Sequence, residues 1–436
     1  MKNLGYIFLF FGRVILFPVY FLSGFVPRRE NLWVFGSWGG HRFADNSAAF
    51  FLFCHEAVDD RIELVWVSRN REIVRDLKER GYSACWIWSP RGIVSALTAG
   101  LHIFDCFPKD TNYWLSRGAK RVNLWSGVPL KVFERDIDNR SSRYYRLFHG
   151  NIIERSFYGL MMPWHITRPD LAIATSDETA HIVSKAFGLQ DSQVFVTGLP
   201  RNDAIFDLPH QEAQQVDKAM QLYGEAVSGD ETVFLYLPTF RDDGTQFIDF
   251  DWDELNDNLG RKGAKLFFKS HPEDRNRYSA DFPNIIQLTQ EAEVSSLLPG
   301  ADVLISDYSS VIFDFMLLGR PIIYYIPDLL KFETGCRSFN FHPREVAVGS
   351  VCESFDELLD ALDQIAGGAS SIASARRDEV MERMHTYCDA RSSERVLDII
   401  VNRFYGLRRN EVFVAQPGSV EKYFVQGDPS TGNRSQ

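Results

Sequence analysis

The chain has 436 residues, a length that accommodates two substantial domains, and 45% of them are hydrophobic, which is enough for a large core. The net charge of −11 argues against a nucleic-acid-binding protein, because no basic surplus is available to meet phosphates. The six cysteines form no CxxC pair, and no histidine stands at zinc-ligand spacing. We therefore predict free thiols in a reducing compartment and no metal site.

The N-terminal segment has the composition of a membrane-associating element. Residues 4–26 are strongly apolar, but Arg13 interrupts the run and Pro18 follows it. A spanning helix needs about 20 apolar residues with few charges. Arg28 and Arg29 would favour anionic lipid headgroups. Three interpretations stay open: a helix that lies in the plane of the membrane, a transmembrane helix, and a helix packed on the body of the protein.

From residue 32 onward, short apolar runs alternate with helical patterns. In the first half the apolar runs predict strands at 32–37, 64–68, 84–88, 101–106, 122–127, 171–176 and 194–198. The helical patterns predict helices at 46–57, 70–80 and 177–187. A polar, acid-rich helix at 211–226 resembles a connector.

The same rhythm restarts in the second half. Strands are predicted at 232–240, 264–272, 285–289, 302–310 and 321–328. Helices are predicted at 252–260, 292–298, 311–318 and 354–366, followed by a long helical stretch over 370–408. The Gly-, Pro- and Ser-containing end of the chain predicts a loose tail.

Strand–helix alternation predicts right-handed βαβ units and parallel sheets. The predicted fold class is therefore α/β, with two Rossmann-like domains facing a cleft and an N-terminal apolar helix. The expected divisions are a membrane-associating segment at 1–28, Rossmann-like domains at 29–205 and 206–370, C-terminal helices at 371–410, and a flexible tail at 411–436.

The strongest motif is Asp307-Tyr308-Ser309-Ser310, which follows a buried strand and immediately precedes a helix. Exposed N–H groups and hydroxyls at a helix N-terminus bind anions, and open α/β sheets bind ligands at the carboxyl ends of their strands. These residues predict a site for cofactor phosphates. The alternative is an ordinary Asp/Ser helix cap without a ligand.

Two further strand ends in the second half carry polar residues. His271 precedes a proline, which fixes an extended backbone, and it could donate to a phosphate or act as an acid or base. Thr239 and Arg241 could contact a pyrophosphate, because arginine binds phosphate through two parallel bonds. The alternatives are a surface turn for His271 and a surface ion pair between Arg241 and Asp242.

Three loops in the first half follow predicted strands. The glycine-rich loop at 36–47 supplies four polar side chains to the cleft, namely His41, Arg42, Asp45 and Asn46. The segment 124–131, which ends at Lys131, is a second strand-to-loop element that should face the same cleft. In the third loop, at 197–203, Arg201 and Asp203 are interpreted as structural residues of a hinge.

Together these pieces resemble one family, the CDP-glycerol glycerophosphotransferases, which are primases and polymerases of wall teichoic acid and related capsules. The resemblance covers about residues 32–365 and rests on motifs found in the family's order. These are the GG--(F/Y)-DN loop, the TG-PRND hinge, the PT-RD strand end, the HP dipeptide, the serine-rich turn with FDF, and RPII-Y-PD.

The resemblance implies a glycosyltransferase-B-like fold with an N-terminal acceptor domain and a C-terminal nucleotide-donor domain. It implies transfer of a phosphopolyol from a CDP-activated donor, with Mg²⁺ as an option on the donor pyrophosphate and no tightly bound cofactor. Asp307, Ser309 and Ser310 would hold the donor phosphates. His271 would lie near the pyrophosphate, and Thr239 and Arg241 would line the donor side.

One position departs from the family pattern. The family motif WHG-PLK carries a histidine that is thought to deprotonate the acceptor hydroxyl, whereas this chain has Ser126 there. Serine is a poor base at neutral pH. His41 is the first candidate to replace that histidine, and His149 and His165 are weaker ones.

Three functions remain open at this point. The favoured one is phosphopolyol transfer to a hydroxyl of a lipid-linked or surface-polymer acceptor, with release of CMP. The Ser126 departure motivates two others, a nucleotide-sugar glycosyltransferase of the same fold and a non-catalytic subunit for polymer assembly. The basic, apolar N-terminus predicts a peripheral location at the cytoplasmic face of the plasma membrane.

Overall fold

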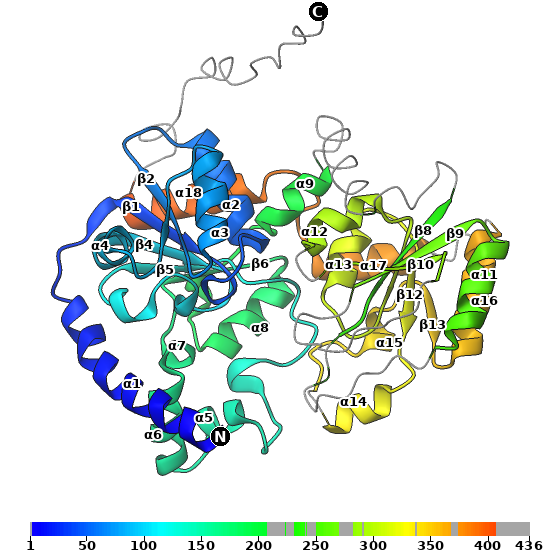
Figure 1. Ribbon diagram of the computed structural model, residues 1–436, viewed down its shortest axis with the longest axis horizontal. Helices are drawn as coiled ribbons and strands as arrows, with labels where there is room; N and C mark the ends of the chain where they lie inside the picture. Colours follow the sequence, from blue (N-terminus) through cyan, green and yellow to red (C-terminus); the bar gives the residue numbers. More distant parts are fainter. Residues whose placement is uncertain are drawn as a thin grey trace, which may run out of the picture.

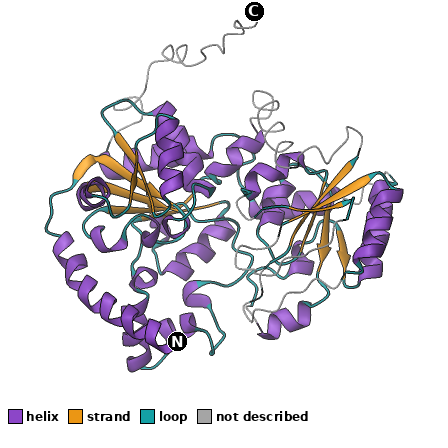
Figure 2. Ribbon diagram, viewed as in Figure 1, coloured by secondary structure: helices purple, strands orange, loops and turns teal. Residues whose placement is uncertain are grey.

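A computed structural model describes residues 2–206, 223, 231–239, 241, 250–269, 282–289, 292–335, 338–367 and 374–406. Within them the chain forms two parallel β-sheets, each flanked by helices (Figures 1 and 2). The predicted α/β class with two sheet domains is confirmed. The connector helix predicted at 211–226, apart from Tyr223, and the predicted tail at 411–436 lie outside the described residues.

The first sheet has seven strands in the order β3-β2-β1-β4-β5-β6-β7, all paired in parallel. Their bounds are β1 Arg29–Gly36, β2 Glu63–Ser68, β3 Ala84–Trp86, β4 Ala99–Phe104, β5 Lys120–Asn123, β6 Leu171–Ala174 and β7 Val194–Val196. All seven overlap strands predicted from the sequence. The order reverses direction between β1 and β4, which is the switch point of a doubly wound sheet.

The second sheet repeats this topology with six strands in the order β10-β9-β8-β11-β12-β13. Their bounds are β8 Thr232–Leu237, β9 Ala264–Phe268, β10 Ile285–Gln287, β11 Val303–Ser306, β12 Ile322–Tyr325 and β13 Ser350–Cys352. Five of these strands were predicted, and β13 at the sheet edge was not. The switch point here lies between β8 and β11.

Helices cover both faces of each sheet (Figure 2). Around the first sheet they are α2 Asp45–Ala57, α3 Arg71–Glu79, α4 Pro90–Thr98, α5 Arg143–His149, α6 Ile152–Met161, α7 Pro163–Ile166, α8 Asp177–Phe187 and α9 Asp203–Phe206. Around the second they are α11 Trp252–Arg261, α12 Val294–Leu297, α13 Val311–Met316, α14 Leu329–Gly335, α15 Pro343–Val346, α16 Phe355–Ala366 and α17 Ser374–Met384. The chain's last described helix is α18 Ser392–Tyr405.

The helical stretch predicted over 370–408 contains two helices, α17 and α18, which lie beside different sheets (Figure 1). Val396, Ile400 and Val401 of α18 are fully buried and pack with Trp33 of the first sheet. The first backbone N–H groups of α18, at Ser392 and Ser393, donate to the carboxylate of Asp203 at 2.7 and 2.8 Å. A carboxylate at a helix N-terminus satisfies free N–H groups and opposes the helix dipole, so Asp203 fixes where α18 begins.

The N-terminal helix is α1, Lys2–Ser23, and part of its surface packs on the first domain. The rings of Tyr20 and Tyr113 stack at 4.5 Å, and the guanidinium of Arg13 lies 4.4 Å from the centre of the Trp164 ring. Within the described residues, no helix combines the length and apolarity that a membrane crossing requires. The predicted N-terminal apolar helix is therefore not supported as an apolar span. Arg13 and Pro18 both lie inside α1 and interrupt its apolar residues.

Candidate active site

The two switch points face each other across a cavity of about 390 Å³ between the domains, which we call the interdomain cavity. The first domain and its hinge line it with Arg42, Asp45, Ser126, Arg201 and Asn202. The second domain lines it with Lys269, Glu293, Ser295, Ser309, Ser310 and Asp314. A cavity between domains at the carboxyl ends of parallel strands is the expected location of a ligand site in this architecture.

The predicted serine turn contributes Ser309 and Ser310 to this cavity. Both follow β11 and precede α13, and the hydroxyl of Ser310 makes no hydrogen bond to the helix it precedes. The loop with Ser126 approaches the turn from the other domain, because a Cβ built on Gly127 would lie 3.0 Å from the Ser310 hydroxyl oxygen. Gly127 also has a φ of 146°, so a side chain there would be strained. The loop after β5 and the serine turn are therefore immediate neighbours.

Asp307, the first residue of the turn, is buried behind the serines. Its carboxylate accepts hydrogen bonds from the backbone N–H groups of Thr239 at 2.9 Å and Tyr308 at 2.5 Å. Its Oδ2 also lies 2.8 Å from Nη1 of Arg241. The carboxylate thus ties the end of β8 to the end of β11, and its oxygens point to protein groups.

Arg241 is engaged in the same way. Its Nε and Nη2 donate to both carboxylate oxygens of Asp328 at 2.8 and 2.9 Å, in addition to the contact with Asp307. The Arg241 side chain is only 4% exposed. Burial by itself would lower its pKa, but the neighbouring carboxylates of Asp307 and Asp328 outweigh burial and raise the pKa. The Tyr308 hydroxyl donates to Asp328 at 2.9 Å. Thr239 and Arg241 therefore lie behind the serine turn, and neither lines the interdomain cavity.

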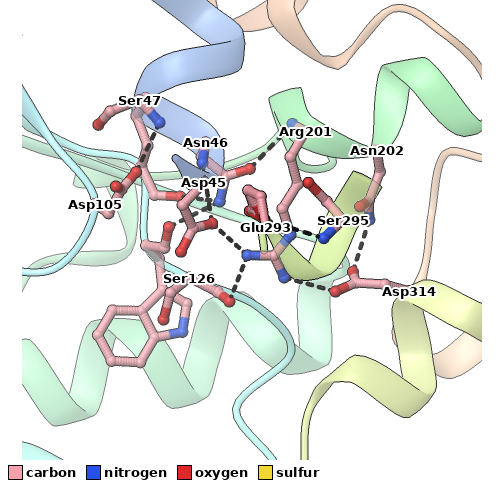
Figure 3. Close-up of polar contacts among 12 residues, drawn as sticks. Asp45, Asn46, Ser47, Asp105, Ser126, Arg201, Asn202, Glu293, Ser295 and Asp314 are labelled. Carbon is pink, nitrogen blue, oxygen red and sulfur yellow. Dashed lines mark hydrogen bonds and ion pairs between the residues drawn. The ribbon is translucent and has the colours of Figure 1, made fainter. Parts of the chain in front are cut away.

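Arg201 is the central cation of the interdomain cavity (Figure 3). Its Nη1 pairs with Asp45 and donates to the backbone oxygen of Ser126 at 2.7 Å. Its Nη2 pairs with Asp314 of the second domain at 2.6 Å. Arg201 therefore joins the start of helix α2, the loop after β5 and helix α13. The sequence interpretation placed Arg201 as a structural residue of a hinge and did not identify its acidic partners, for which the PRND and FDF motifs carried the available signal.

Burial shapes the acids around Arg201. Burial raises the pKa of Asp45, although Arg201 opposes that shift. Burial likewise raises the pKa of Glu293, and the charge of Asp45 adds to the effect. Asp45 has a φ of 64°, a left-handed conformation that is uncommon for residues other than glycine. Strained backbone conformations of this kind are found most often at functional sites, where they orient a side chain.

The remaining predicted residues of the first domain fall into two environments. Asn46 is buried and donates to the backbone oxygens of Leu124 and Trp125 at 3.2 and 2.8 Å, so it holds the loop that carries Ser126. Arg42 lines the interdomain cavity and lies 5.4 Å from the Trp38 ring centre. Lys131 pairs through its backbone with Phe339 of the second domain, and its ammonium lies over the Phe332 ring.

His41 lines a second cavity, of about 650 Å³, which Ser126 also lines. Burial and the charges of Arg69 and Lys109 lower the pKa of His41 from 6.5. A histidine with a lowered pKa is neutral at neutral pH and so can accept a proton. His149 and His165 line neither cavity; His165 Nδ1 lies 2.8 Å from Glu134.

His271 lies outside the described residues, together with its neighbours Ser270 and Pro272. Lys269, which precedes them at the end of β9, is described and lines the interdomain cavity. Among the described residues, no group of three His, Cys, Asp or Glu side chains could hold a metal ion.

Residues 19–402 match the family model for CDP-Glycerol:Poly(glycerophosphate) glycerophosphotransferase. The chain belongs to this family. Teichoic acid ribitol-phosphate polymerase TarK of Staphylococcus aureus is 31% identical over 241 residues, which make up 53% of this chain and 45% of that protein. The chain therefore spans less than half the length of that relative.

Two further likenesses extend over more of the chain. Teichoic acid poly(glycerol phosphate) polymerase of Bacillus spizizenii is 25% identical over 365 residues, which cover 79% of this chain and 86% of that protein. A structure of the wall teichoic acid polymerase TagF, soaked with CDPG, matches with a TM-score of 0.70 at 20% identity, covering 87% of this chain and 90% of that one. At this identity the structural likeness shows the fold alone.

Proposed function

We propose that the chain transfers a phosphopolyol, such as glycerol phosphate, from a CDP-activated donor to a hydroxyl of a lipid-linked or surface-polymer acceptor. Family membership supports the donor class. The two facing Rossmann-like domains are proposed to work as in glycosyltransferase-B enzymes, with the acceptor on the first domain and the nucleotide on the second. The observation that carries the proposal is the close approach of the loop at Gly127 to Ser310, together with the presence of Ser126 and Ser310 in the lining of one interdomain cavity.

The reaction is an in-line displacement at phosphorus. The acceptor oxygen forms a bond to the β-phosphorus, the bond from that phosphorus to the bridging oxygen breaks, and CMP leaves with the bridging oxygen and its electrons. The hydroxyl proton passes to a base on the protein. Catalysis of this type depends mainly on positioning and on stabilising charge that develops on phosphate oxygens.

The donor side of the proposal has two layers. Ser309 and Ser310, with the N–H groups at the start of α13, contact the phosphates, and Lys269 contributes a positive charge. Asp307, Thr239 and Arg241 act as positioning residues that hold the serine turn in place. His271 keeps its proposed place beside the pyrophosphate.

The acceptor side consists of first-domain residues. Arg42 and Asp45 line the interdomain cavity, Asn46 holds the Ser126 loop, and Lys131 sits at the domain contact. His41 is proposed as the base that stands in for the family histidine, because it lines one cavity with Ser126 and its pKa is lowered. Ser126 is proposed to orient the acceptor hydroxyl.

The proposal is tested by incubating the purified chain with CDP-glycerol, CDP-ribitol and UDP-hexoses, with and without Mg²⁺, in the presence of a lipid-linked acceptor. Acceptor-dependent release of CMP from a CDP-polyol is the expected result. Release of UDP from a UDP-hexose would instead support sugar transfer, the alternative that Ser126 motivates. Donor binding with no release of either nucleotide would support a non-catalytic subunit.

The role of His41 predicts a pH dependence. A histidine acts as a base only when it is neutral, and the pKa of His41 is lowered from its ordinary value of 6.5. As the pH is decreased, kcat/KM should therefore stay constant until the pH is below 6.5 and should decrease only there. The His41→Gln variant should lose that acid limb and about 10²-fold in kcat. CMP release measured from about pH 5 to pH 8 checks both effects. His181→Gln, an exposed histidine on α8, is the matched control. An unchanged acid limb in His41→Gln would remove His41 from the mechanism.

Membrane attachment through α1 and α6 is the second part of the proposal. These two helices lie side by side, and the rings of Phe10 and Phe157 stack between them at 6.2 Å (Figure 1). Ile15 on α1 is 70% exposed, and Ile152 and Ile153 on α6 are 80% and 77% exposed. Apolar side chains gathered on neighbouring helices favour an in-plane attachment at the cytoplasmic face of the plasma membrane.

Flotation with anionic phospholipid vesicles tests the attachment. Ile15, Ile152 and Ile153 are replaced together with serine. Each replacement removes roughly 1.5 kcal/mol of favourable free energy from burying an apolar side chain in the membrane, so each should lower the vesicle affinity about tenfold. Leu330→Ser is the matched control, since Leu330 is 76% exposed on α14 of the other domain. Equal binding of the triple variant and the wild type would refute this surface.

A further inference from the structure

The second cavity, which we call the cationic pocket, lies at the carboxyl ends of the first sheet's strands, beneath α1. The loops after β2, β3 and β4 supply Arg69, Trp88 and Lys109, while α1 supplies Arg13 and α7 supplies Trp164. Ser126 lines this pocket and the interdomain cavity alike. The pocket therefore connects the N-terminal helix to the place where the two domains meet.

The pocket holds more positive than negative charge. Arg13, Arg69 and Lys109 are the cations of this pocket, and within the described residues no salt bridge joins any of them to a carboxylate, although the charge of Asp110 acts on Arg69 and Lys109. Asp110 is the facing acid, and its carboxylate accepts hydrogen bonds from the backbone N–H groups of Gly39 and Cys106 at 2.7 and 3.2 Å. Burial and the neighbouring Arg69 lower the pKa of Arg13, so these two cations repel each other when no anion lies between them.

Aromatic rings lie beneath these cations. The Trp164 ring centre is 4.4 Å from the Arg13 guanidinium and 5.7 Å from the Lys109 ammonium, and the Trp88 ring lies 5.8 Å from Arg69. The Trp164 Nε1–H group is buried, and no hydrogen-bond acceptor is recorded for it among the described residues. A buried donor without a partner costs free energy, so this N–H group favours a ligand oxygen.

We propose that the cationic pocket binds the anionic headgroup of the acceptor, a phosphate or diphosphate ester that carries a sugar or polyol. The arginines and the lysine pair with the phosphate oxygens, and the tryptophan faces stack on the sugar or polyol. The acceptor hydroxyl then lies toward Ser126, at the opening into the interdomain cavity. Because Arg13 belongs to α1, the ligand would be received from a membrane surface. This inference rests on the proposed function and specifies its acceptor site.

Calorimetric titration without any donor tests the pocket. The probe is a short-chain prenyl diphosphate that carries one N-acetylhexosamine, titrated into the full chain. Lys109→Gln and Arg13→Gln should each weaken binding about tenfold, since each removes one charge-assisted contact. Trp164→Phe keeps a ring but removes the N–H donor, and should weaken binding by about threefold to tenfold. Lys78→Gln, an exposed lysine on α3 that lines neither cavity, should bind as the wild type does.

Two further measurements separate the sources of the anion and the two levels of the proposal. Vesicles of phosphatidylglycerol without acceptor should bind Lys109→Gln and the wild type equally. If Lys109→Gln instead lost vesicle affinity as strongly as it loses probe affinity, the pocket would bind the headgroups of bulk lipid. Unchanged probe affinity in all three pocket variants would overturn the acceptor site. The titration contains no nucleotide, so its result does not depend on turnover. A wild type that binds the probe but releases no CMP from CDP-glycerol would overturn the proposed function and leave the binding site in place.

Discussion

Replacing Arg201 with methionine is expected to lower the free energy of unfolding by about 3–5 kcal/mol and to abolish CMP release. The substitution leaves Asp45 and Asp314 buried without their shared cation, at 7% and 6% side-chain exposure. The free-energy cost of leaving a buried charge without its partner is much larger than the net stabilisation that the intact ion pair provided. Urea denaturation followed by tryptophan fluorescence measures the change, and nucleotide release measures its effect on the site.

Two companion variants distinguish lost charge from lost geometry. Arg201→Lys keeps the charge but cannot reach Asp45, Asp314 and the Ser126 backbone oxygen together, so it should recover part of the stability and little of the activity. Adding Asp45→Asn and Asp314→Asn to Arg201→Met removes the buried charges and should restore stability without activity. An Arg201→Met protein with wild-type stability and turnover would show that the ion pairs of Arg201 contribute neither to the stability of the fold nor to catalysis.

The sequence predicted the fold well because the relevant signals are local. Apolar runs of strand length alternate with helical patterns, and every predicted strand has a counterpart in the structure. Strand ends were placed too late, as at 302–310 against Val303–Ser306, because hydroxyl and aromatic residues of the turn continue the strand-like composition. The sequence predicted a helical stretch over 370–408 but not where it divides, since the start of α18 depends on Asp203, which binds it from far away in the chain.

The site was predicted less completely because its decisive contacts join distant segments. Asp307 and Arg241 were both recognised as polar residues at strand ends, where phosphate ligands are expected. The sequence could not show that they bind each other and Asp328, since the partners are 66 and 87 positions apart. The interpretation of Arg201 failed to foresee Asp45 and Asp314 for the same reason, with separations of 156 and 113 positions.

The cationic pocket shows the same limit. Arg13, Arg69 and Lys109 are scattered along the sequence, and each alone reads as an ordinary surface cation. Only the parallel sheet, by gathering the ends of its strands at one edge and placing α1 above them, brings the three into one cavity. The N-terminal segment, for which the sequence left three interpretations open, therefore also contributes the Arg13 side chain to this cavity.

Ser310→Ala is expected to lower kcat for CMP release by about 10²–10³-fold, with little change in the free energy of unfolding. The size follows from removing one aligned hydrogen-bond donor at a point where charge develops on the leaving phosphate. The fold should tolerate the change because the Ser310 hydroxyl does not cap α13, whereas Ser309 Oγ accepts the N–H of Val311 at 3.4 Å. The Ser310 hydroxyl also lies close to the first-domain loop at Gly127, where the proposed function brings donor phosphate and acceptor together.

Steady-state CMP release with CDP-glycerol varied at saturating acceptor checks this expectation. Thr334→Ala, which removes an exposed hydroxyl on α14, is the control for a missing hydroxyl in the same domain. Ser309→Ala should lower both stability and turnover, because that hydroxyl supports the helix start as well as lining the cavity. Wild-type turnover in both serine variants would mean that donor phosphates bind elsewhere. The Asp307–Arg241–Asp328 cluster would then stabilise a turn with no ligand, which is the helix-cap alternative that the sequence left open.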